Sequence, residues 1–136
     1  MDQETFKRWL DAYGRAWEAR DPAAAAALFA PDARYHWTPF GEPKRGRAGI
    51  AQAWQEATSR QYHIRFRYEI LAVKGSQGIA HWWTSLVRAA TNQPVRIDGI
   101  LLVTFNSENL CEMFREWWHA EEPAQEDGSP APHGTD

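Results

Sequence analysis

The hydrophobic period of this chain changes at residue 61, and that change constrains the fold more than any other feature. Apolar and charged residues alternate from Tyr62 to Ile70, which is the pattern of a β-strand with one apolar face. Three more strands are predicted over residues 79–89, 95–105 and 110–119, with turn sequences at 75–78, 91–94 and 106–109. Short turns between consecutive strands predict an antiparallel meander.

Helical spacing dominates the chain before residue 61. The predicted order is an amphipathic helix over 2–20, a short helix from Asp21-Pro22 to Ala30 with Leu28 and Phe29 inward, a short strand over 33–38, a loop over 39–46 and a third helix over 47–59. Helices grouped before a mostly antiparallel sheet predict an α+β fold. A sheet that curls around these helices encloses an apolar cavity.

The last predicted strand carries bulky apolar side chains on both faces, because Phe114 and Trp118 alternate with Met113 and Trp117. Such a strand is expected in the middle of a sheet. Glu116 shares a face with Phe114 and Trp118, where an ionised carboxylate is costly unless it is paired. Two interpretations stay open for Glu116: a structural one, with a salt bridge to an Arg or a strand end that reaches water, and a functional one.

The composition fits one globular domain, predicted over residues 1–120, with a disordered tail over 121–136, where bulky apolar residues are absent. A net charge of −3 without a basic stripe predicts no nucleic-acid partner. The apolar runs are too short to span a bilayer, and the N-terminus carries no leader pattern, so no membrane partner and a cytoplasmic location are expected. Cys111 is the single cysteine, which excludes an internal disulfide, and a core role is expected for it.

Several segments together resemble the nuclear transport factor 2-like superfamily, which includes steroid isomerases, limonene epoxide hydrolase and SnoaL-like proteins. The resemblance covers residues 4–119 and is carried by Asp21-Pro22 with Leu28-Phe29-Ala30-Pro31-Asp32-Ala33, by Pro43 to Ile50, and by Phe114-Arg115-Glu116-Trp117-Trp118. It implies a cone-shaped fold with three N-terminal helices packed in a strongly curved, mostly antiparallel sheet. It implies no single activity, because one fold hosts many functions.

The resemblance also shows which working residues of these families are missing. The carboxylate base of the steroid isomerases falls at Trp37 or Thr38, neither of which can accept a proton, while their oxyanion-binding Tyr matches Tyr13 and its acidic partner falls near Leu101. In the match to limonene epoxide hydrolase, a Tyr and the last carboxylate correspond to Tyr35 and Glu116. The Arg and middle Asp of that enzyme are replaced by Trp83 and Ser85. Neither catalytic set is complete.

The candidate site combines this mapping with the alternation within each strand. The predicted catalytic residues are Glu116, Tyr13, Tyr35 and His81. The predicted ligand-binding residues are Trp17, Trp37, Trp54, Phe66, Trp83, Ser85, Leu101, Phe114 and Trp118. Ser85, Gly99 and Glu116 are expected opposite one another on adjacent strands.

The opposite face of the sheet is then too apolar to face water in a monomer. We expect a homodimer through an outer face that includes Trp82, Leu86, Ile100, Leu102, Met113 and Trp117. The alternative is that the tail or an edge helix covers this face.

Three functional hypotheses remain: an enzyme that acts on a small apolar or aromatic molecule by acid/base catalysis, a ligand-binding module with the same pocket, and a dimeric interaction domain whose tryptophans fill the cone. His36, His81 and His119 lie on different predicted strands without ligand spacing, so no metal is predicted. No Gly-rich phosphate loop is present, and no cofactor is predicted.

Overall fold

The computed structural model describes residues 1–123 and confirms the α+β fold class. The elements are α1 (Gln3–Glu18), α2 (Pro22–Ala26), β1 (Phe29–His36), β2 (Lys44–Arg45), α3 (Gly46–Thr58), β3 (Gln61–Lys74), β4 (Gln77–Arg88), β5 (Gln93–Phe105) and β6 (Cys111–Glu121). The strands form one sheet in the order β2-β1-β6-β5-β4-β3. The four long strands form the predicted antiparallel meander, and β1 runs parallel to β6.

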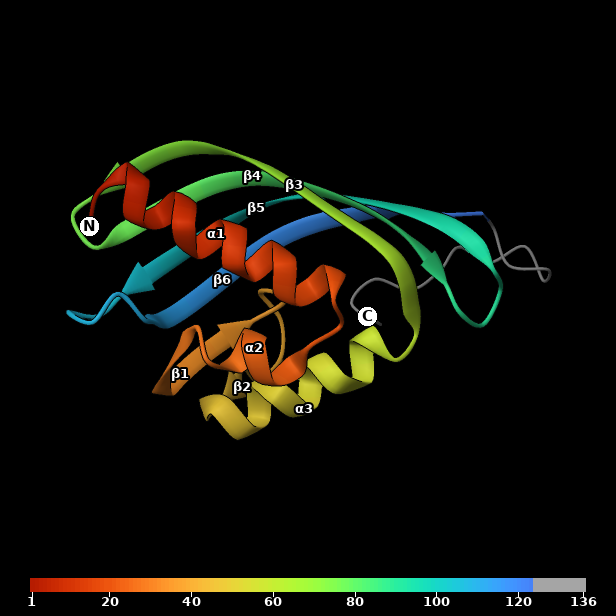
Figure 1. The fold of residues 1–136 in the computed structure, drawn as a ribbon, viewed down its shortest axis with the longest axis horizontal. Coiled ribbons are helices and arrows are strands. Elements are labelled where there is room, and N and C mark those ends of the chain that lie inside the picture. The colour runs from red at the N-terminus through yellow and green to blue at the C-terminus, as the bar shows by residue number, and fades with distance from the viewer. Residues whose placement is uncertain (124–136) are drawn as a thin grey trace.

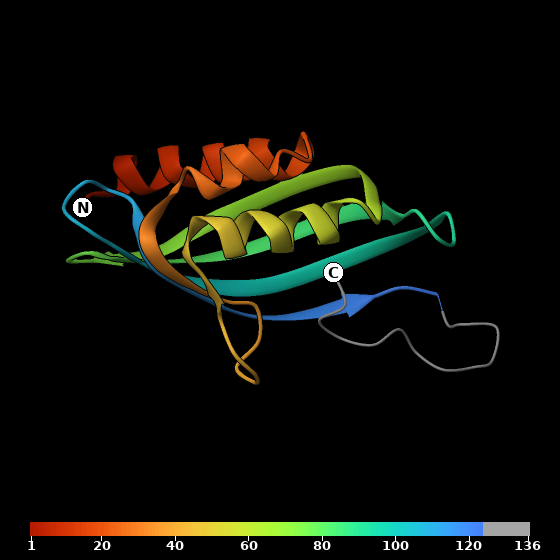
Figure 2. The ribbon, with the colours of Figure 1, turned by 90° about the horizontal axis from the view of Figure 1, so that it is seen from below.

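The three helices lie on the concave side of the curved sheet, as Figures 1 and 2 show. Asp2 caps the start of α1, and its carboxylate accepts a hydrogen bond from the Thr5 N–H at 2.8 Å, which satisfies one free donor of the first turn. Phe6 and Leu10 on its inner stripe are fully buried against the sheet. The aromatic residues of α1 therefore form one wall of the space between helices and sheet.

The second helix is shorter than predicted. Asp21 caps it and Pro22 opens it, as expected, but the helix ends at Ala26, and Phe29 is the first residue of β1. The cause is pairing with β6, because Phe29 lies opposite Cys111 and the Cys111 N–H donates to the Leu28 carbonyl at 3.0 Å. The assignment of residues 27–30 to helix was wrong for this reason.

A β-bulge in β3 decides which face of β4 points inward. Close to the turn, Lys74 pairs with Gln77, but an extra residue at Leu71 shifts the register, so that Phe66 lies opposite Thr84 and Tyr68 opposite Trp82. Without the bulge, Phe66 would lie opposite Ser85. Because a shift of one residue reverses every side chain, the predicted inward positions of Trp83 and Ser85 were wrong.

β6 lies between β1 and β5, in the middle of the sheet as predicted. A second bulge at Glu112 separates the pairs Phe105–Cys111 and Thr104–Met113, so Cys111 is buried on the inner side. Beyond the bulge, Phe114, Glu116 and Trp118 face inward. Glu116 lies opposite Leu101, and Ser85 lies opposite Arg96. The predicted alignment of Ser85, Gly99 and Glu116 was therefore wrong.

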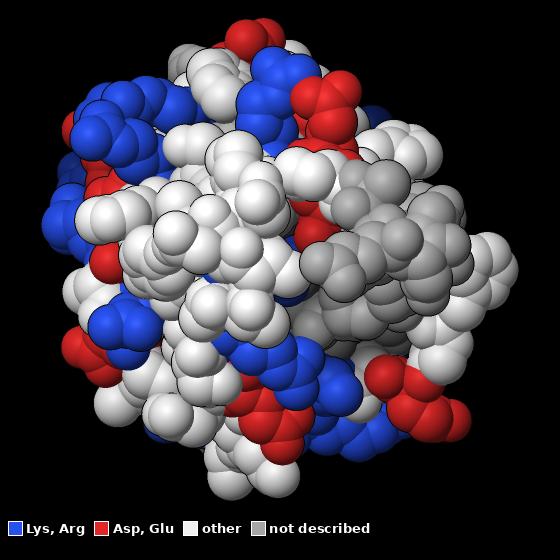
Figure 3. Space-filling model, turned by 90° about the vertical axis from the view of Figure 1, so that its right-hand side faces the viewer, with Lys and Arg blue, Asp and Glu red and all other residues white. Residues whose placement is uncertain are grey.

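The disordered tail was predicted to begin at residue 121, but β6 includes Glu121, and Glu122 forms an ion pair with Arg88 at 3.0 Å, so these two residues are part of the fold. Residues 124–136, the rest of that prediction, lie outside the described part of the chain. Within residues 1–123, no helix is long and apolar enough to cross a membrane. Figure 3 shows one end of the molecule, where Lys and Arg side chains alternate with Asp and Glu around an uncharged area.

Candidate functional site

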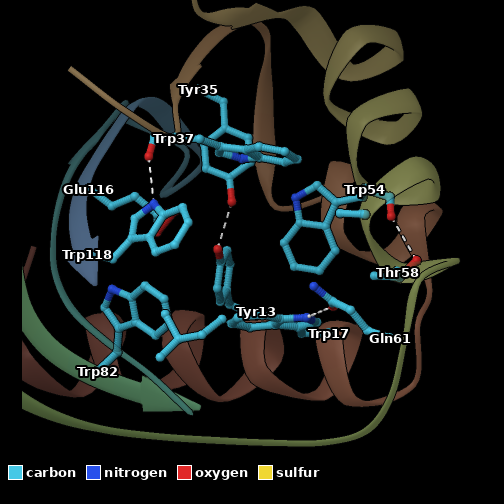
Figure 4. Close-up of a pocket in the computed structure, with 12 residues that line it drawn as sticks. Tyr13, Trp17, Tyr35, Trp37, Trp54, Thr58, Gln61, Trp82, Glu116 and Trp118 are labelled. Atoms are coloured by element: carbon cyan, nitrogen blue, oxygen red, sulfur yellow. Dashed lines mark hydrogen bonds between the residues drawn. The ribbon is translucent and has the colours of Figure 1, made fainter. Parts of the chain in front are cut away.

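A cavity lies between α1, α3 and the concave face of the sheet (Figure 4). Its volume accessible to the centres of water molecules is about 60 Å³. The lining residues are mostly aromatic: Tyr13, Trp17, Tyr35, Trp37, Trp54, Ala57, Thr58, Gln61, Trp82, Ile97, Glu116 and Trp118. They come from every layer of the fold, so the cavity exists only when helices and sheet are packed together.

Two tyrosines of the lining meet between Trp118 and Trp54 in the view of Figure 4. The hydroxyl groups of Tyr13 from α1 and Tyr35 from β1 lie 2.8 Å apart and share a hydrogen bond (Figure 4). Burial raises the pKa of both phenols well above the ordinary value of 10.0, and the nearby Glu116 carboxyl raises them further. Both groups therefore stay neutral at physiological pH and can act as hydrogen-bond donors.

Glu116 is the one ionisable carboxyl among the lining residues. It has 8% of its surface accessible and makes no hydrogen bond or ion pair with any residue of 1–123. Burial raises its pKa well above the ordinary value of 4.5, because no nearby positive charge compensates the lost hydration. The structural interpretation, a salt bridge to an Arg or a strand end in water, is therefore wrong.

Two indole N–H groups form hydrogen bonds that link different elements of the cavity wall. The Trp118 N–H donates to the Trp37 carbonyl at 2.8 Å, which links β6 to the segment after β1. The Trp17 N–H donates to the Gln61 side-chain oxygen at 2.8 Å, which links α1 to the start of β3. These bonds hold the Trp17 and Trp118 rings in fixed orientations.

The other three indole N–H groups of the lining have no partner among residues 1–123. The nitrogens of Trp37, Trp54 and Trp82 are all sealed from solvent. A buried donor without an acceptor costs roughly 1–3 kcal/mol. The cavity walls are therefore built at a cost in stability, which is typical of functional sites.

Several predicted site residues do not line the cavity. Leu101 and Phe114 are fully buried in the core, and Phe66 packs behind the lining against Trp17 and Trp82. Trp83 and Ser85 point to the outer face, as the bulge at Leu71 requires. Their predicted contact with a ligand in the cavity was wrong.

His81 also lies on the outer face, which contradicts its predicted place at the pocket mouth. Its Nε2 is 3.0 Å from an Asp98 carboxylate oxygen, and its Nδ1 is 3.8 Å from Glu69. The same contact places Asp98 outside the cavity. His81 therefore cannot exchange a proton with Glu116 across the sheet.

The sequence-based interpretation missed five lining residues. Trp82 was assigned to the outer face, and Ala57, Thr58, Gln61 and Ile97 were not assigned to the cavity. The even-numbered positions of β4, from Ala80 to Leu86, carry no charge, whereas the odd-numbered ones include His81 and Ser85. That contrast was the signal in the sequence from which the inward position of Trp82 could have been predicted.

The cavity therefore combines a neutral carboxyl group, a hydrogen-bonded pair of phenols and a wall of aromatic rings. A carboxyl group with a raised pKa can donate and recover a proton near neutral pH. One phenol of the pair can donate to an oxygen of a bound molecule while the other donates to it. Within residues 1–123, no group of three His, Cys, Asp or Glu side chains is placed to hold a metal ion.

The burial of Glu116 predicts a pH dependence of stability. Its pKa is higher in the folded state than the 4.5 of the unfolded chain, so the folded state binds more protons between those two values. Stability should therefore fall as pH rises through that window, by up to about 1.4 kcal/mol per pH unit. Glu116→Gln has no such loss. The difference in free energy of unfolding, variant minus unsubstituted protein, should therefore increase from pH 5 to pH 8 when both are measured by urea unfolding.

The control for this measurement is Glu112→Gln, which removes an exposed carboxyl of the same strand. Its stability relative to the unsubstituted protein should stay constant over the same pH range. A constant difference for Glu116→Gln as well would show that Glu116 titrates normally in the folded protein.

Comparison with known proteins gives one family and several relatives. Residues 7–113 match the SnoaL-like domain family. A steroid Δ-isomerase from Nocardioides simplex is 29% identical over 111 residues, which are 82% of this chain and 84% of that protein. This is a similarity in sequence across most of both chains.

Two solved structures show the same fold. SalBIII, an epoxide hydrolase/cyclase-like enzyme of pyran ring formation in the polyether salinomycin, superimposes with a TM-score of 0.77 at 15% identity over 90% of this chain and 98% of its own. The second is a protein with a ketosteroid isomerase-like fold from Catenulispora acidiphila, solved in complex with trimethylamine. It superimposes with a TM-score of 0.71 at 15% identity, over 80% of this chain and 83% of its own. At such low identity, these similarities concern the fold alone.

Proposed function

Because this chain belongs to the SnoaL-like domain family, we propose that it is an enzyme that moves a proton on a small molecule with a largely apolar surface. The observation that carries this proposal is Glu116, a buried carboxyl group that faces the cavity without a partner among residues 1–123. Structural carboxylates are paired when they are buried, because an unpaired charge is costly. An unpaired carboxyl at a cavity fits proton transfer better than it fits a structural role.

In the proposed reaction, Glu116 acts as both acid and base. As a carboxylate it takes a proton from the bound molecule, and as a carboxylic acid it returns the proton to another atom of that molecule. One of the two phenols, Tyr13 or Tyr35, donates to an oxygen on which negative charge develops, while the other donates to that phenol and keeps it in place. The steroid Δ-isomerase relative supports a reaction of this isomerase type.

Once a molecule is bound, it and the aromatic rings exclude water from this reaction. Water would hydrate the carboxylate and lower its pKa, so its exclusion keeps Glu116 basic. Trp37 and Trp118 contribute through their hydrogen bond, which closes the wall beside Glu116. Tyr13, Tyr35 and the ring-bearing residues are thus proposed as positioning and binding groups around a single acid/base.

The test of this proposal is proton exchange with solvent. The protein is incubated in D₂O with a panel of small unsaturated ketones, and deuterium incorporation is measured by mass spectrometry. Incorporation that depends on Glu116 supports the proposal. Incorporation that is unchanged in Glu116→Gln contradicts the role of this residue.

A binding module without turnover is the second candidate. The observation that favours it is the position of His81, which leaves Glu116 as the only carboxyl or imidazole group among the lining residues. A ligand that protects the protein thermally without proton exchange or turnover would support this alternative. The open cavity itself argues against the hypothesis that the tryptophans only fill the cone.

We further propose a homodimer through the outer face of the sheet, with a corrected set of residues. Trp82 and Leu86 point inward, whereas Trp83, Ile100 and Trp117 are exposed on the outer face, at 38%, 37% and 44% of their surfaces. Neighbouring exposed apolar residues on the sheet support an interface. The cytoplasmic location stays a prediction from the sequence.

The dimer is tested by charge substitution on this face. Trp83→Glu together with Trp117→Glu should halve the mass measured by light scattering, because two carboxylates on each chain would be buried against two others. Phe40→Glu, at an exposed position outside the sheet, should leave the mass unchanged. A double variant of unchanged mass would rule out this interface.

A further inference from the structure

Two aromatic rings of the lining turn their faces toward the cavity. In Figure 4, Trp37 and Trp17 are seen edge-on above and below the cavity, so their ring faces border it, while Trp54 and Trp118 lie at its sides. The N–H groups of Trp17 and Trp118 are bonded to the protein, and the indole nitrogens of Trp37, Trp54 and Trp82 are buried. A molecule in this space therefore contacts the π-faces of Trp17 and Trp37.

The face of an aromatic ring is negative, because the ring carries a quadrupole with a positive edge. A cation over such a face gains about 0.5–2 kcal/mol, most with Trp. No Lys, Arg or His belongs to the lining itself, although Lys44 Nζ lies 5.7 Å from the centre of the Trp37 ring. The cavity wall is complementary to positive charge.

Glu116 adds a negative charge to the same space when its carboxyl group is ionised. Its carboxyl lines the cavity, has no partner within residues 1–123, and is the one acidic group among the lining residues. A buried carboxylate is stabilised most by an opposite charge at contact distance. Aromatic rings with one carboxyl group and no basic residue form a cage for an organic cation.

We propose that the cavity binds a small alkylammonium ion, such as a trimethylammonium group, with its methyl groups against the indole faces and its charge beside Glu116. This inference rests on the proposed small-molecule site and names the class of molecule it takes. A methylated ammonium has the largely apolar surface that the walls require. It also supplies a positively charged partner for Glu116, which no lining residue provides.

The size of the cavity supports this class. A volume of about 60 Å³ open to the centres of water molecules is a small space that a compact cation can occupy.

Binding should release a proton. The groups that face Glu116 across the cavity are Tyr13 from α1 and Tyr35 from β1, both neutral phenols; α3 and β4 contribute indole rings without charge. Burial keeps Glu116 protonated in the empty cavity, and the cation stabilises its carboxylate. Affinity for the cation should therefore rise with pH, and it should level off once Glu116 is ionised in the ligand-free protein as well.

The experiment compares choline with 3,3-dimethyl-1-butanol, which has the same shape but carries no charge. Affinities for the full chain are measured by tryptophan fluorescence and isothermal titration calorimetry at pH 8. Choline should bind at least about tenfold more tightly than the alcohol, and its affinity should fall at pH 5. Equal affinities, tighter binding of the alcohol, or no binding of choline would overturn the proposal.

Matched variants locate the binding. Glu116→Gln should abolish the preference for choline, whereas Glu112→Gln on the outer side should keep it. Trp54→Leu should weaken choline binding by about fivefold or more, while Trp83→Leu, outside the cavity, should not. If Glu116→Gln does not fold, the pH dependence of the unsubstituted protein provides the same information.

These results separate the inference from the proposed function. Proton exchange that depends on Glu116 without choline binding would reject the cage and leave the enzyme proposal intact. Choline binding that depends on Glu116 without any turnover would support the cage in a binding module. A preference for choline that survives in Glu116→Gln would overturn the pairing of the cation with this carboxyl.

Discussion

Glu116→Gln is expected to reduce kcat by about 10²-fold or more, because the amide keeps the shape of the side chain but cannot transfer a proton. KM for a neutral substrate should change only a few-fold, since the ring contacts remain. For a cationic substrate, KM should rise as well. Steady-state kinetics on a substrate found by deuterium exchange would measure both constants.

Two controls define what this result means. Glu116→Asp keeps a carboxyl group but shortens the side chain, which withdraws the acid from the cavity. The activity of this variant should therefore lie between that of the unsubstituted protein and that of Glu116→Gln. Glu112→Gln should retain full activity, because that carboxyl is exposed on the same strand. Turnover that is unchanged in Glu116→Gln would remove Glu116 from the mechanism.

Phe114→Ala is expected to lower the free energy of unfolding by about 3–5 kcal/mol. Phe114 is fully buried in the centre of the sheet. Its ring lies 4.5 Å from that of Tyr35 and 5.6 Å from that of Tyr13, centre to centre, so its loss leaves a void directly behind the tyrosine pair. Urea unfolding monitored by circular dichroism measures the change.

A conservative substitution and a surface substitution complete this test. Phe114→Leu fills most of the space and should cost less than Phe114→Ala. Phe40→Ala, where 80% of the side chain is exposed, should change stability by no more than about 0.5 kcal/mol. A loss below about 1 kcal/mol in Phe114→Ala would show that the core collapses around the missing ring.

The sequence predicted most of the architecture because its signals are periodic. The inner stripe of α1, the Asp21-Pro22 start of α2 and the meander from β3 to β6 follow from spacing and turn residues alone. The central position of β6 followed from its apolar residues on both faces. These features depend on the local sequence and are readable without the fold.

The inward face of β4 could not be predicted in the same way. Trp82 and Trp83 are adjacent and equally apolar, so alternation alone does not choose between them. The choice is made by the extra residue at Leu71 in the neighbouring strand, and no Gly or Pro marks that bulge. One unmarked residue therefore changed the predicted place of Trp83, Ser85 and His81 together.

Glu116 was identified as unusual from its apolar neighbours, but its environment was not readable from the sequence. Whether an Arg reaches a buried carboxyl depends on the register of strands far apart in the chain. In the structure, the residues that line the cavity around Glu116 include no Lys, Arg or His. Only the three-dimensional arrangement distinguishes an unpaired carboxyl from a salt bridge.

The parallel pairing of β1 with β6 has a consequence for synthesis on the ribosome. β6 is the last strand of the described residues to emerge, yet it lies in the middle of the sheet, where it joins β1 to the meander. A nascent chain that lacks β6 has neither Glu116 nor the strand that connects the two parts of the sheet. The domain is therefore expected to fold after translation of residue 121, in one cooperative step that depends on contacts distant in sequence.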